Sequence, residues 1–300
     1  MTTALSATAT PEEVVKAQFE AYNANDAQAL AATYAEDAQL FMHPSTPMVA
    51  GAAQILERFK GRFAVSKPQA RLLNRIVAAD MVIDHEIVTS SGEPGPGRME
   101  MVAMYQVKAG RIANAWFTMA HMTQLRTAQA ADIPAMEALI ARSGIELSAG
   151  FYTPEQAQAV TRHVFGVDTQ LVADQTYFVI EQDGKLVACG GWSKRATLFG
   201  ADKMKTEADP LLDPATQAAR IRAFFVSPDT PRQGLGRMLM DHCSEQAAAA
   251  GFHTLELAAT MPGVPLYLAS GFEITERFEI ALPDNVQVPL ARMRKSIKAR

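Results

Sequence analysis

Near the N-terminus, apolar residues recur at the three- to four-residue spacing of an amphipathic helix. The first helix is predicted to begin at Thr10-Pro11-Glu12-Glu13. A threonine cap, a proline in the first turn and a glutamate three residues after the cap together form a capping box. This helix is expected to end at a break at Asn25-Asp26. A second, short helix is expected from there to about Tyr34, and a third over residues 52–63.

Alternating apolar and polar residues replace this spacing further along the chain. The alternation is interrupted by short segments with glycine and other turn residues, as expected between paired strands. Strands are predicted over residues 71–79, 81–90, 99–107 and 111–119. Helices followed by a run of antiparallel hairpins indicate an α+β domain.

The order of elements changes near residue 123, where helices begin to fall between strands. A strand at 125–127 precedes helices that start at Asp132 and at a second capping box, Thr153–Gln156, with an irregular loop over 143–152. Further strands are predicted over residues 177–182, 185–192, 221–226, 254–259, 272–280 and 286–297. Helices are predicted over 237–250 and 265–270, and a Pro/Gly loop over 227–236. We therefore expect a disordered tail at residues 1–10, one domain at 11–122 and a second at 123–300.

Composition and charge narrow the range of functions. The chain has 300 residues and is 48% hydrophobic, which suffices for two ordinary globular domains. Its formal net charge of −4 argues against a nucleic-acid partner, and no apolar run reaches the ~18–20 residues of a membrane span. Cys189 and Cys243 lie in no metal-binding pattern, so no metal is expected. The chain starts without a secretion signal, so we expect a cytoplasmic protein.

Asp84-His85-Glu86 looks like a reactive cluster, but successive strand residues point to opposite faces. Asp84 and Glu86 therefore share one face, and His85 lies on the other face with Ile83 and Ile87. On that apolar stripe His85 can either line a pocket or be an ordinary hydrogen-bonded, half-buried side chain. Two more side chains are interpreted as structural, namely His43 before a proline and Trp116.

A glycine-rich loop between a strand and a helix carries the clearest chemical signal. In residues 222–237, backbone N–H groups and the positive end of the helix dipole converge, which makes an anion site. Arg232 and Arg237 lie at the helix start, where cations oppose the dipole, and this favours a phosphate ligand over two solvated arginines. Leu239 stands where a dinucleotide fingerprint needs its third glycine, and no Gly-Lys-Ser/Thr of a Walker A loop is present.

The first half resembles the SnoaL-like family, which has the cone-shaped α+β barrel of nuclear transport factor 2. The matching stretches are VVKAQFEAYNANDAQALAATYAEDAQL, the HPS turn, GAAQILERF and MVAMYQVKAGRIANAWF, which cover about residues 11–122. The resemblance implies the fold and leaves the function open. That fold carries isomerases, hydrolases and plain binding or dimerisation modules.

The second half, about residues 123–298, resembles the GNAT superfamily of N-acetyltransferases. Val226-Ser227-Pro228 and Gly234-Leu235-Gly236 match the family's acetyl-CoA pyrophosphate loop, although Pro231 stands at its first position and has no N–H to donate. Residues 267–272 match the family's later Y-x-x-x-G-F segment. The resemblance implies a mixed α/β domain with a central, mostly antiparallel sheet.

The same resemblance implies acetyl-CoA as co-substrate and gives Tyr267 the role of protonating or hydrogen-bonding the leaving thiolate. The coenzyme would be held by Phe224, Phe225, Val226, Arg232, Gln233, Gly234, Leu235, Gly236 and Arg237. An amine must be neutral to attack, and Glu256, between Leu255 and Leu257 on its strand, is the candidate base. His242 is interpreted as solvated.

The acceptor pocket is expected around Trp192, Arg195, Phe199, Phe151 and Tyr152. We predict an N-acetyltransferase that moves an acetyl group from acetyl-CoA to a small-molecule or peptide amine in a ternary complex. The first domain would bind a ligand or mediate homodimerisation. Two alternatives stay open. One is an isomerase or hydrolase acting in the first domain near His85 or His43, and the other is a non-catalytic CoA-binding regulator whose Pro231 marks a degenerate loop.

Overall fold

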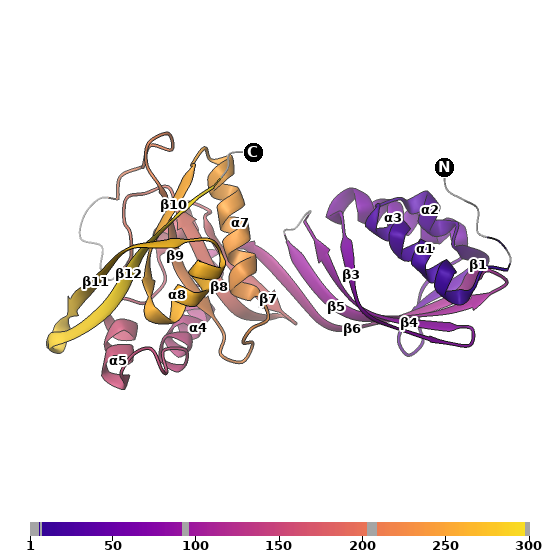
Figure 1. Cartoon of the computed structure of the whole chain (residues 1–300), viewed down its shortest axis with the longest axis horizontal. Helices are drawn as coiled ribbons and strands as arrows, with labels where there is room; N and C mark the ends of the chain where they lie inside the picture. The colour runs from indigo at the N-terminus through magenta and orange to yellow at the C-terminus, as the bar shows by residue number, and fades with distance from the viewer. Residues whose placement is uncertain (1–5, 7, 92–95, 203–208, 298–300) are drawn as a thin grey trace. The chain divides into compact units, whose positions relative to one another are not determined.

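The structure is a computed structural model that describes residues 6, 8–91, 96–202 and 209–297. The chain forms two compact units, Met1–Gln124 and Leu125–Arg300 (Figure 1). The tail predicted for residues 1–10 and the turn predicted around residues 92–97 fall partly outside the described residues.

The first unit is an α+β fold in which helices cover one face of a curved sheet (Figure 1). Strands β6, β5, β4 and β3 pair antiparallel in that order, β1 lies parallel to β6, and β2 pairs antiparallel with β1. The elements are α1 (Pro11–Asn23), α2 (Ala27–Ala31), β1 (Tyr34–Met42), β2 (Thr46–Ala50), α3 (Ala52–Ser66), β3 (Gln69–Ala78), β4 (Met81–Ser90), β5 (Gly97–Lys108) and β6 (Arg111–Thr127).

Local signals start these helices as the sequence predicts. Thr10 accepts a hydrogen bond from the Glu13 backbone N–H, and the Glu13 carboxylate accepts one from the Thr10 N–H at 2.8 Å, so the capping box is confirmed. Asn25 takes a positive φ of 55° between α1 and α2, and Asp26 caps α2 by accepting from the Ala29 N–H. The apolar faces of α1 and α3 then pack on the sheet, with Val14, Val15, Ile55 and Phe59 buried.

The predicted second helix is present as α2, but it is shorter than predicted, and the segment from Tyr34 that was predicted to end it begins a strand. Helix α2 ends at Ala31, and β1 pairs with β6 through Gln39 opposite Asn114. Strand β2 was also missed. The partner of β1 lies far along the sequence, and such tertiary pairing overrides local propensity.

The second unit is built around a mostly antiparallel sheet with the strand order β11-β12-β10-β9-β8-β7, in which β9 and β10 run parallel (Figure 1). This order confirms the predicted mixed α/β class. The elements are α4 (Ile133–Glu146), α5 (Pro154–His163), α6 (Thr169–Ala173), β7 (Tyr177–Gln182), β8 (Lys185–Ser193), β9 (Ala219–Val226), α7 (Leu235–Ala249), β10 (Thr254–Thr260), α8 (Val264–Ala269), β11 (Glu273–Leu282) and β12 (Val286–Ser296).

Several element boundaries differ from the prediction. The strand expected at 125–127 is the end of the long strand β6, where it neighbours β7. Asp132 does not cap α4 through its side chain; its carboxylate accepts hydrogen bonds from Arg126 at 2.7 Å and from the Gln129 N–H. Helix α4 continues to Glu146, into the predicted loop, and α6 was not predicted.

Candidate functional site

Strands β9 and β10 separate at the centre of the second unit. They pair at two positions, Leu255 opposite Ala219 and Glu256 opposite Arg220. Beyond Arg220, no strand of the described chain pairs with that edge of β9. Backbone N–H and C=O groups along residues 221–226 therefore face an opening between two parallel strands, where a ligand can meet them.

A bulge in β9 shapes the opening. Ala223 and Phe224 stand opposite the single residue Gly190 of β8, and Ala223 has a positive φ of 54°. A Cβ built on Gly190 would lie 2.6 Å from the Phe224 ring, so a glycine is required beneath that ring. The bulge thus turns Phe224 out of the regular alternation of the strand.

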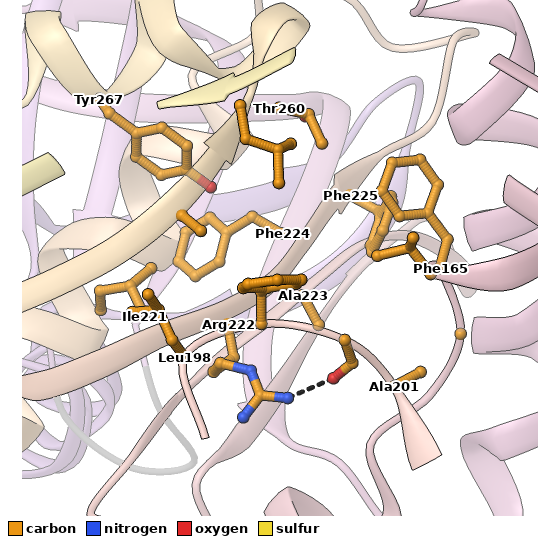
Figure 2. Close-up of a pocket in the computed structure, with 16 residues that line it drawn as sticks. Phe165, Leu198, Ala201, Ile221, Arg222, Ala223, Phe224, Phe225, Thr260 and Tyr267 are labelled. Carbon is orange, nitrogen blue, oxygen red and sulfur yellow. Dashed lines mark hydrogen bonds between the residues drawn. The ribbon is translucent and has the colours of Figure 1, made fainter. Parts of the chain in front are cut away.

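A pocket of about 90 Å³ lies in this opening (Figure 2). Its walls come from β9, from the far end of β10, from α8, from β12 and from the segments 164–166 and 198–201. The lining residues are Val164, Phe165, Gly166, Leu198, Phe199, Gly200, Ala201, Ile221, Arg222, Ala223, Phe224, Phe225, Ala258, Thr260, Tyr267 and Leu290.

Tyr267 brings a phenolic hydroxyl into this pocket. Its ring lies beside Phe224, with ring centroids 6.3 Å apart, and its hydroxyl points toward the space between Phe224 and Thr260 (Figure 2). Phe272 packs against the other side of the ring at 5.9 Å. Burial raises the pKa of Tyr267 well above its ordinary value, so the phenol remains a hydrogen-bond donor at every physiological pH.

Arg222, which the sequence analysis did not single out, fixes one wall of the pocket. It donates a hydrogen bond to the carbonyl oxygen of Gly200 (Figure 2) and another to that of Thr197, and it pairs with Asp168 at 2.9 Å. Its side chain is almost fully buried, and burial lowers the pKa of Arg222. A charged residue within the apolar stretch of residues 219–226 was the available signal.

The glycine-rich loop connects β9 to α7 and ends in a helix N-terminus without a side-chain cap. Gly234 occupies the cap position with a φ of 80°, which side chains other than glycine rarely adopt. A Cβ on Gly234 would meet nothing within 4 Å, whereas a Cβ on Gly236 would lie 2.9 Å from Leu266 of α8. Gly234 therefore leaves open space at the positive end of α7, and Gly236 lets α7 approach α8. Helix α7 begins at Leu235, just before the predicted start at 237.

The polar residues of the loop point in different directions. Arg237 pairs with Asp241 and donates to the carbonyl of Ala269 at 2.9 Å, so its charge is directed toward the end of α8. Gln233 accepts a hydrogen bond from Gln182 at 2.9 Å. Arg232 is exposed and has a positive φ of 57°.

Glu256 lies on the same face of β10 as the pocket residues Ala258 and Thr260, because strand residues alternate. Its carboxylate forms an ion pair with Arg220, and both side chains are mostly buried. The structure therefore places the candidate base at the point where the strands part, with a cation already beside it.

Of the residues predicted for an acceptor pocket, Phe199 lines the pocket between β9 and β10. Trp192 is instead buried in the core against Phe252, at 6.0 Å between ring centroids. Arg195 is held by Asp174 at 2.7 Å. The Tyr152 hydroxyl donates to the Pro289 carbonyl at 2.8 Å, and Phe151 is exposed away from the pocket lining.

The remaining sequence candidates in this unit are structural. Cys189 and Cys243 are free and fully buried, and burial raises the pKa of Cys189 to about 12. His242 is half-buried rather than solvated and packs edge-on against Phe178 at 4.5 Å. Over the described residues, no group of His, Cys, Asp and Glu side chains could hold a metal ion, and no helix is long and apolar enough to cross a membrane.

The first unit contains a separate cavity, the cone cavity, between its helices and the covered face of its sheet. Of the two alternatives left open for His85, the structure shows the hydrogen-bonded, half-buried side chain. Glu86 lines the cone cavity, whereas His85 lies on the opposite face and contacts Glu100 at 3.0 Å. His43 is exposed and does not line the cavity. The apolar residues beside His85 did not decide between these alternatives, because both faces of this sheet carry apolar residues.

Comparison with protein families agrees with this division of the chain. The model described as "Acetyltransferase (GNAT) family" matches residues 145–272, and the model described as "SnoaL-like domain" matches residues 15–115. The chain therefore joins a SnoaL-like domain to a GNAT acetyltransferase domain. No curated protein matches it significantly.

Solved structures resemble each domain separately. A GCN5-related N-acetyltransferase from Rhodopseudomonas palustris is 18% identical, with 58% of this chain and 95% of that one covered and a TM-score of 0.44. A cystatin-fold protein from Novosphingobium aromaticivorans is 21% identical over 37% of this chain and 98% of that one, with a TM-score of 0.35. A ketosteroid isomerase-like protein from Catenulispora acidiphila is 19% identical over 37% and 86%, with a TM-score of 0.33.

Proposed function

We propose that the GNAT domain is an acetyl-CoA-dependent N-acetyltransferase that acts on a small-molecule or peptide amine by direct transfer in a ternary complex. The observation that carries this proposal is the pocket between β9 and β10. The unpaired edge of β9 and Tyr267 line this pocket. The uncapped start of α7 follows β9 in the chain and approaches α8, the helix that carries Tyr267, at Gly236 and Leu266.

The residues present fit a coenzyme with a pyrophosphate and an extended amide-bearing arm. The open space at Gly234 faces uncapped backbone N–H groups at the positive end of α7, which suits phosphate oxygens. The free edge of β9 at Phe224, Phe225 and Val226 offers backbone groups to the amides of the arm. When bound, acetyl-CoA would supply the activated thioester. Arg232 and Gln233 directly precede Gly234 in the chain and are the loop side chains proposed to contact the phosphates.

Tyr267 acts in this proposal as a hydrogen-bond donor to the sulfur that leaves. Its raised pKa makes complete loss of the phenolic proton unfavourable, since a free thiol has a pKa of about 8.5. Backbone N–H groups at the end of β9 stabilise the negative charge that develops on the carbonyl oxygen. Glu256, on the pocket face of β10, accepts the proton of the attacking amine, directly or through water.

Binding and thiol release test this function together. We expect the full chain to bind acetyl-CoA in calorimetry and to release free thiol when amines from a broad panel are added. Failure to bind acetyl-CoA would overturn the proposal. Binding without thiol release from any amine would favour the alternative of a non-catalytic CoA-binding regulator.

We also propose that the SnoaL-like domain forms a homodimer through the uncovered face of its sheet. Register pairs place one apolar residue of each strand in a continuous row, opposite to the face that carries Tyr105 and Phe117 in the cone cavity. Trp116 stacks on Phe41 in this row at 5.9 Å, and Ile76 at one end is 53% exposed. The row consists of Ile76, Ile83, Met104, Trp116 and Phe41.

Light scattering on the full chain tests the dimer. We expect a mass of two chains, and a single-chain mass for Trp116→Glu, because a charge in the middle of the row would be desolvated on association. A monomeric wild-type protein at micromolar concentration would overturn this assignment without affecting the acetyltransferase proposal.

A further inference from the structure

The cone cavity is mostly apolar and partly open to solvent, since its lining residues Arg58 and Met119 are exposed. Its volume is about 160 Å³, and a cavity of roughly 150 Å³ in a protein core can hold one benzene molecule. Much of its wall is methionine, a side chain that adapts to irregular ligands. The lining residues are Gln18, Phe19, Tyr22, Leu40, Met42, Met48, Arg58, Phe59, Arg62, Glu86, Met99, Met101, Tyr105, Phe117 and Met119.

Glu86 is a buried carboxyl group without a partner in this cavity. Its side chain is 7% exposed, and no hydrogen bond or ion pair reaches it from the part of the chain that the structure describes. Two residues earlier on β4, Asp84 has both carboxylate oxygens bonded to Arg75, at 2.7 and 2.6 Å. Strand β4 thus carries one carboxylate that is fully paired, Asp84, and one carboxyl group that is available to a ligand in the cavity, Glu86.

The charged and titratable groups around Glu86 come from every neighbouring element. Arg62 lies on α3, Arg75 on β3 and Asp84 on β4, and tyrosines face it from α1, β1 and β5, namely Tyr22, Tyr34 and Tyr105. Burial and the charge of Asp84 raise the pKa of Glu86 to about 7. Near neutral pH this carboxyl therefore holds its proton much of the time and can donate a hydrogen bond.

Arg62 supplies a second unused polar group. Its Nε atom is buried and has no hydrogen-bond partner among the described residues. Its guanidinium carbon lies 6.0 Å from the centre of the Tyr22 ring, on the cavity wall. Arg58, one helical turn earlier on α3, also lines the cavity. With Glu86 protonated, the cavity carries a net positive charge.

We propose that the cone cavity is a binding site for a small apolar carboxylic acid, a one-ring or short-chain molecule whose carboxylate is received by Arg62 and by the Glu86 carboxyl group. A carboxylate has oxygen acceptors for the unused Nε–H of Arg62, and charge-assisted bonds of this kind are among the strongest that proteins form. The methionine and aromatic walls receive the apolar body. An ammonium ligand would instead face Arg58 and Arg62, which repel it.

Three compounds of nearly the same shape test this proposal by calorimetry on the full chain. Benzoate, benzamide and benzylamine differ in charge at one end of the ring, and saturating coenzyme A is present so that the GNAT pocket does not contribute. We expect benzoate to bind at least about tenfold more tightly than benzamide, with benzylamine weakest. A preference for benzylamine, or no binding of benzoate, would overturn the proposal.

Two variants locate the binding. Arg62→Met should weaken benzoate about tenfold. The matched control Lys60→Met removes the same charge from the same helix, where Lys60 pairs with the exposed Glu57, and should leave the affinity unchanged. Glu86→Gln should keep binding while abolishing the loss of benzoate affinity that we expect in the wild type between about pH 6 and 8. Equal affinity in wild type and Arg62→Met, or equal pH dependence in wild type and Glu86→Gln, would contradict the assignment.

Discussion

Glu256 of β10 and Arg220 of β9 form an ion pair at the last position where these two parallel strands are joined. Immediately beyond this pair the strands separate and the pocket begins. The ion pair therefore holds the two strands together at the point where they begin to separate. It also keeps the Glu256 carboxylate close to the pocket, on the face that carries Ala258 and Thr260.

Glu256→Gln should lower turnover by about 100-fold while leaving the KM for acetyl-CoA nearly unchanged. The amide keeps the size of the side chain and a hydrogen-bonding oxygen for Arg220, but it cannot accept the proton of the amine. The measurement is steady-state thiol release. The matched control is Glu276→Gln, which alters a carboxylate paired with Arg292 at 3.0 Å on the same sheet and should not change turnover. Equal losses in both variants would remove the proposed role of Glu256.

Tyr267→Phe should also lower turnover by about 100-fold, with little change in the affinity for acetyl-CoA measured by calorimetry. The phenylalanine ring retains the packing against Phe224 and Phe272, so the loss isolates the hydroxyl. Because the pKa of Tyr267 is raised, its ionisation should not limit the rate at neutral or mildly alkaline pH.

Tyr152→Phe is the control for that change. Tyr152 is a similarly buried tyrosine of the same domain whose hydroxyl donates to the Pro289 carbonyl outside the pocket lining. We expect a stability loss of about 1 kcal/mol and unchanged turnover. If Tyr267→Phe were as active as wild type, the leaving thiolate would need another donor.

Gly234→Ala tests the phosphate position at the start of α7. The substitution places a methyl group at a φ of 80° and into the open space where phosphate oxygens are proposed to lie. Strain should cost about 1–2 kcal/mol of stability. Loss of one charge-assisted hydrogen bond should raise the Kd for acetyl-CoA by about tenfold.

Gly150→Ala separates strain from binding. Gly150 has nearly the same φ, 82°, and also has nothing within 4 Å of a built Cβ, but it lies outside the loop. Both variants should melt at similarly reduced temperatures, and Gly234→Ala alone should bind acetyl-CoA more weakly. Equal affinities would place the phosphates elsewhere.

Features set by local sequence were predictable, and features set by distant contacts were not. The capping boxes at Thr10 and Thr153 and the hairpin turn at Asp183-Gly184 depend on a few neighbouring residues, and they are confirmed. Strand β1 depends on pairing with β6, and local propensity did not reveal it.

The candidate site shows the same limit. The glycine loop and Tyr267 were visible as motifs, but the bulge at Ala223 has no sequence signature. The buried role of Arg222 depends on the carbonyls of Thr197 and Gly200, which only the fold brings to it. For β4 the alternation was correct, but the sequence left open which face is the inner one. Apolar residues occur on both faces, and only the fold shows that Glu86 lines the cone cavity while His85 is the hydrogen-bonded, half-buried side chain.

The stability of the SnoaL-like domain should depend on the proton of Glu86. The pKa of this group is raised from an ordinary value of 4.5 to about 7 by burial and by Asp84. Between these two values the folded chain holds a proton that the unfolded chain has released, so stability falls as the pH rises through this window and levels off above the folded pKa. The loss should approach about 3 kcal/mol.

Glu86→Gln removes this titration while keeping the size of the side chain. Thermal melts of wild type and Glu86→Gln from about pH 4.5 to 8.5 should therefore diverge. The melting temperature of the variant should rise relative to that of the wild type until the pH passes 7, and the difference should stay constant above it. Because every comparison is made between the two proteins at the same pH, the other titrating groups cancel. Parallel curves would show that the Glu86 carboxyl group ionises freely in the folded protein, which would mean that the cone cavity is open to water at Glu86.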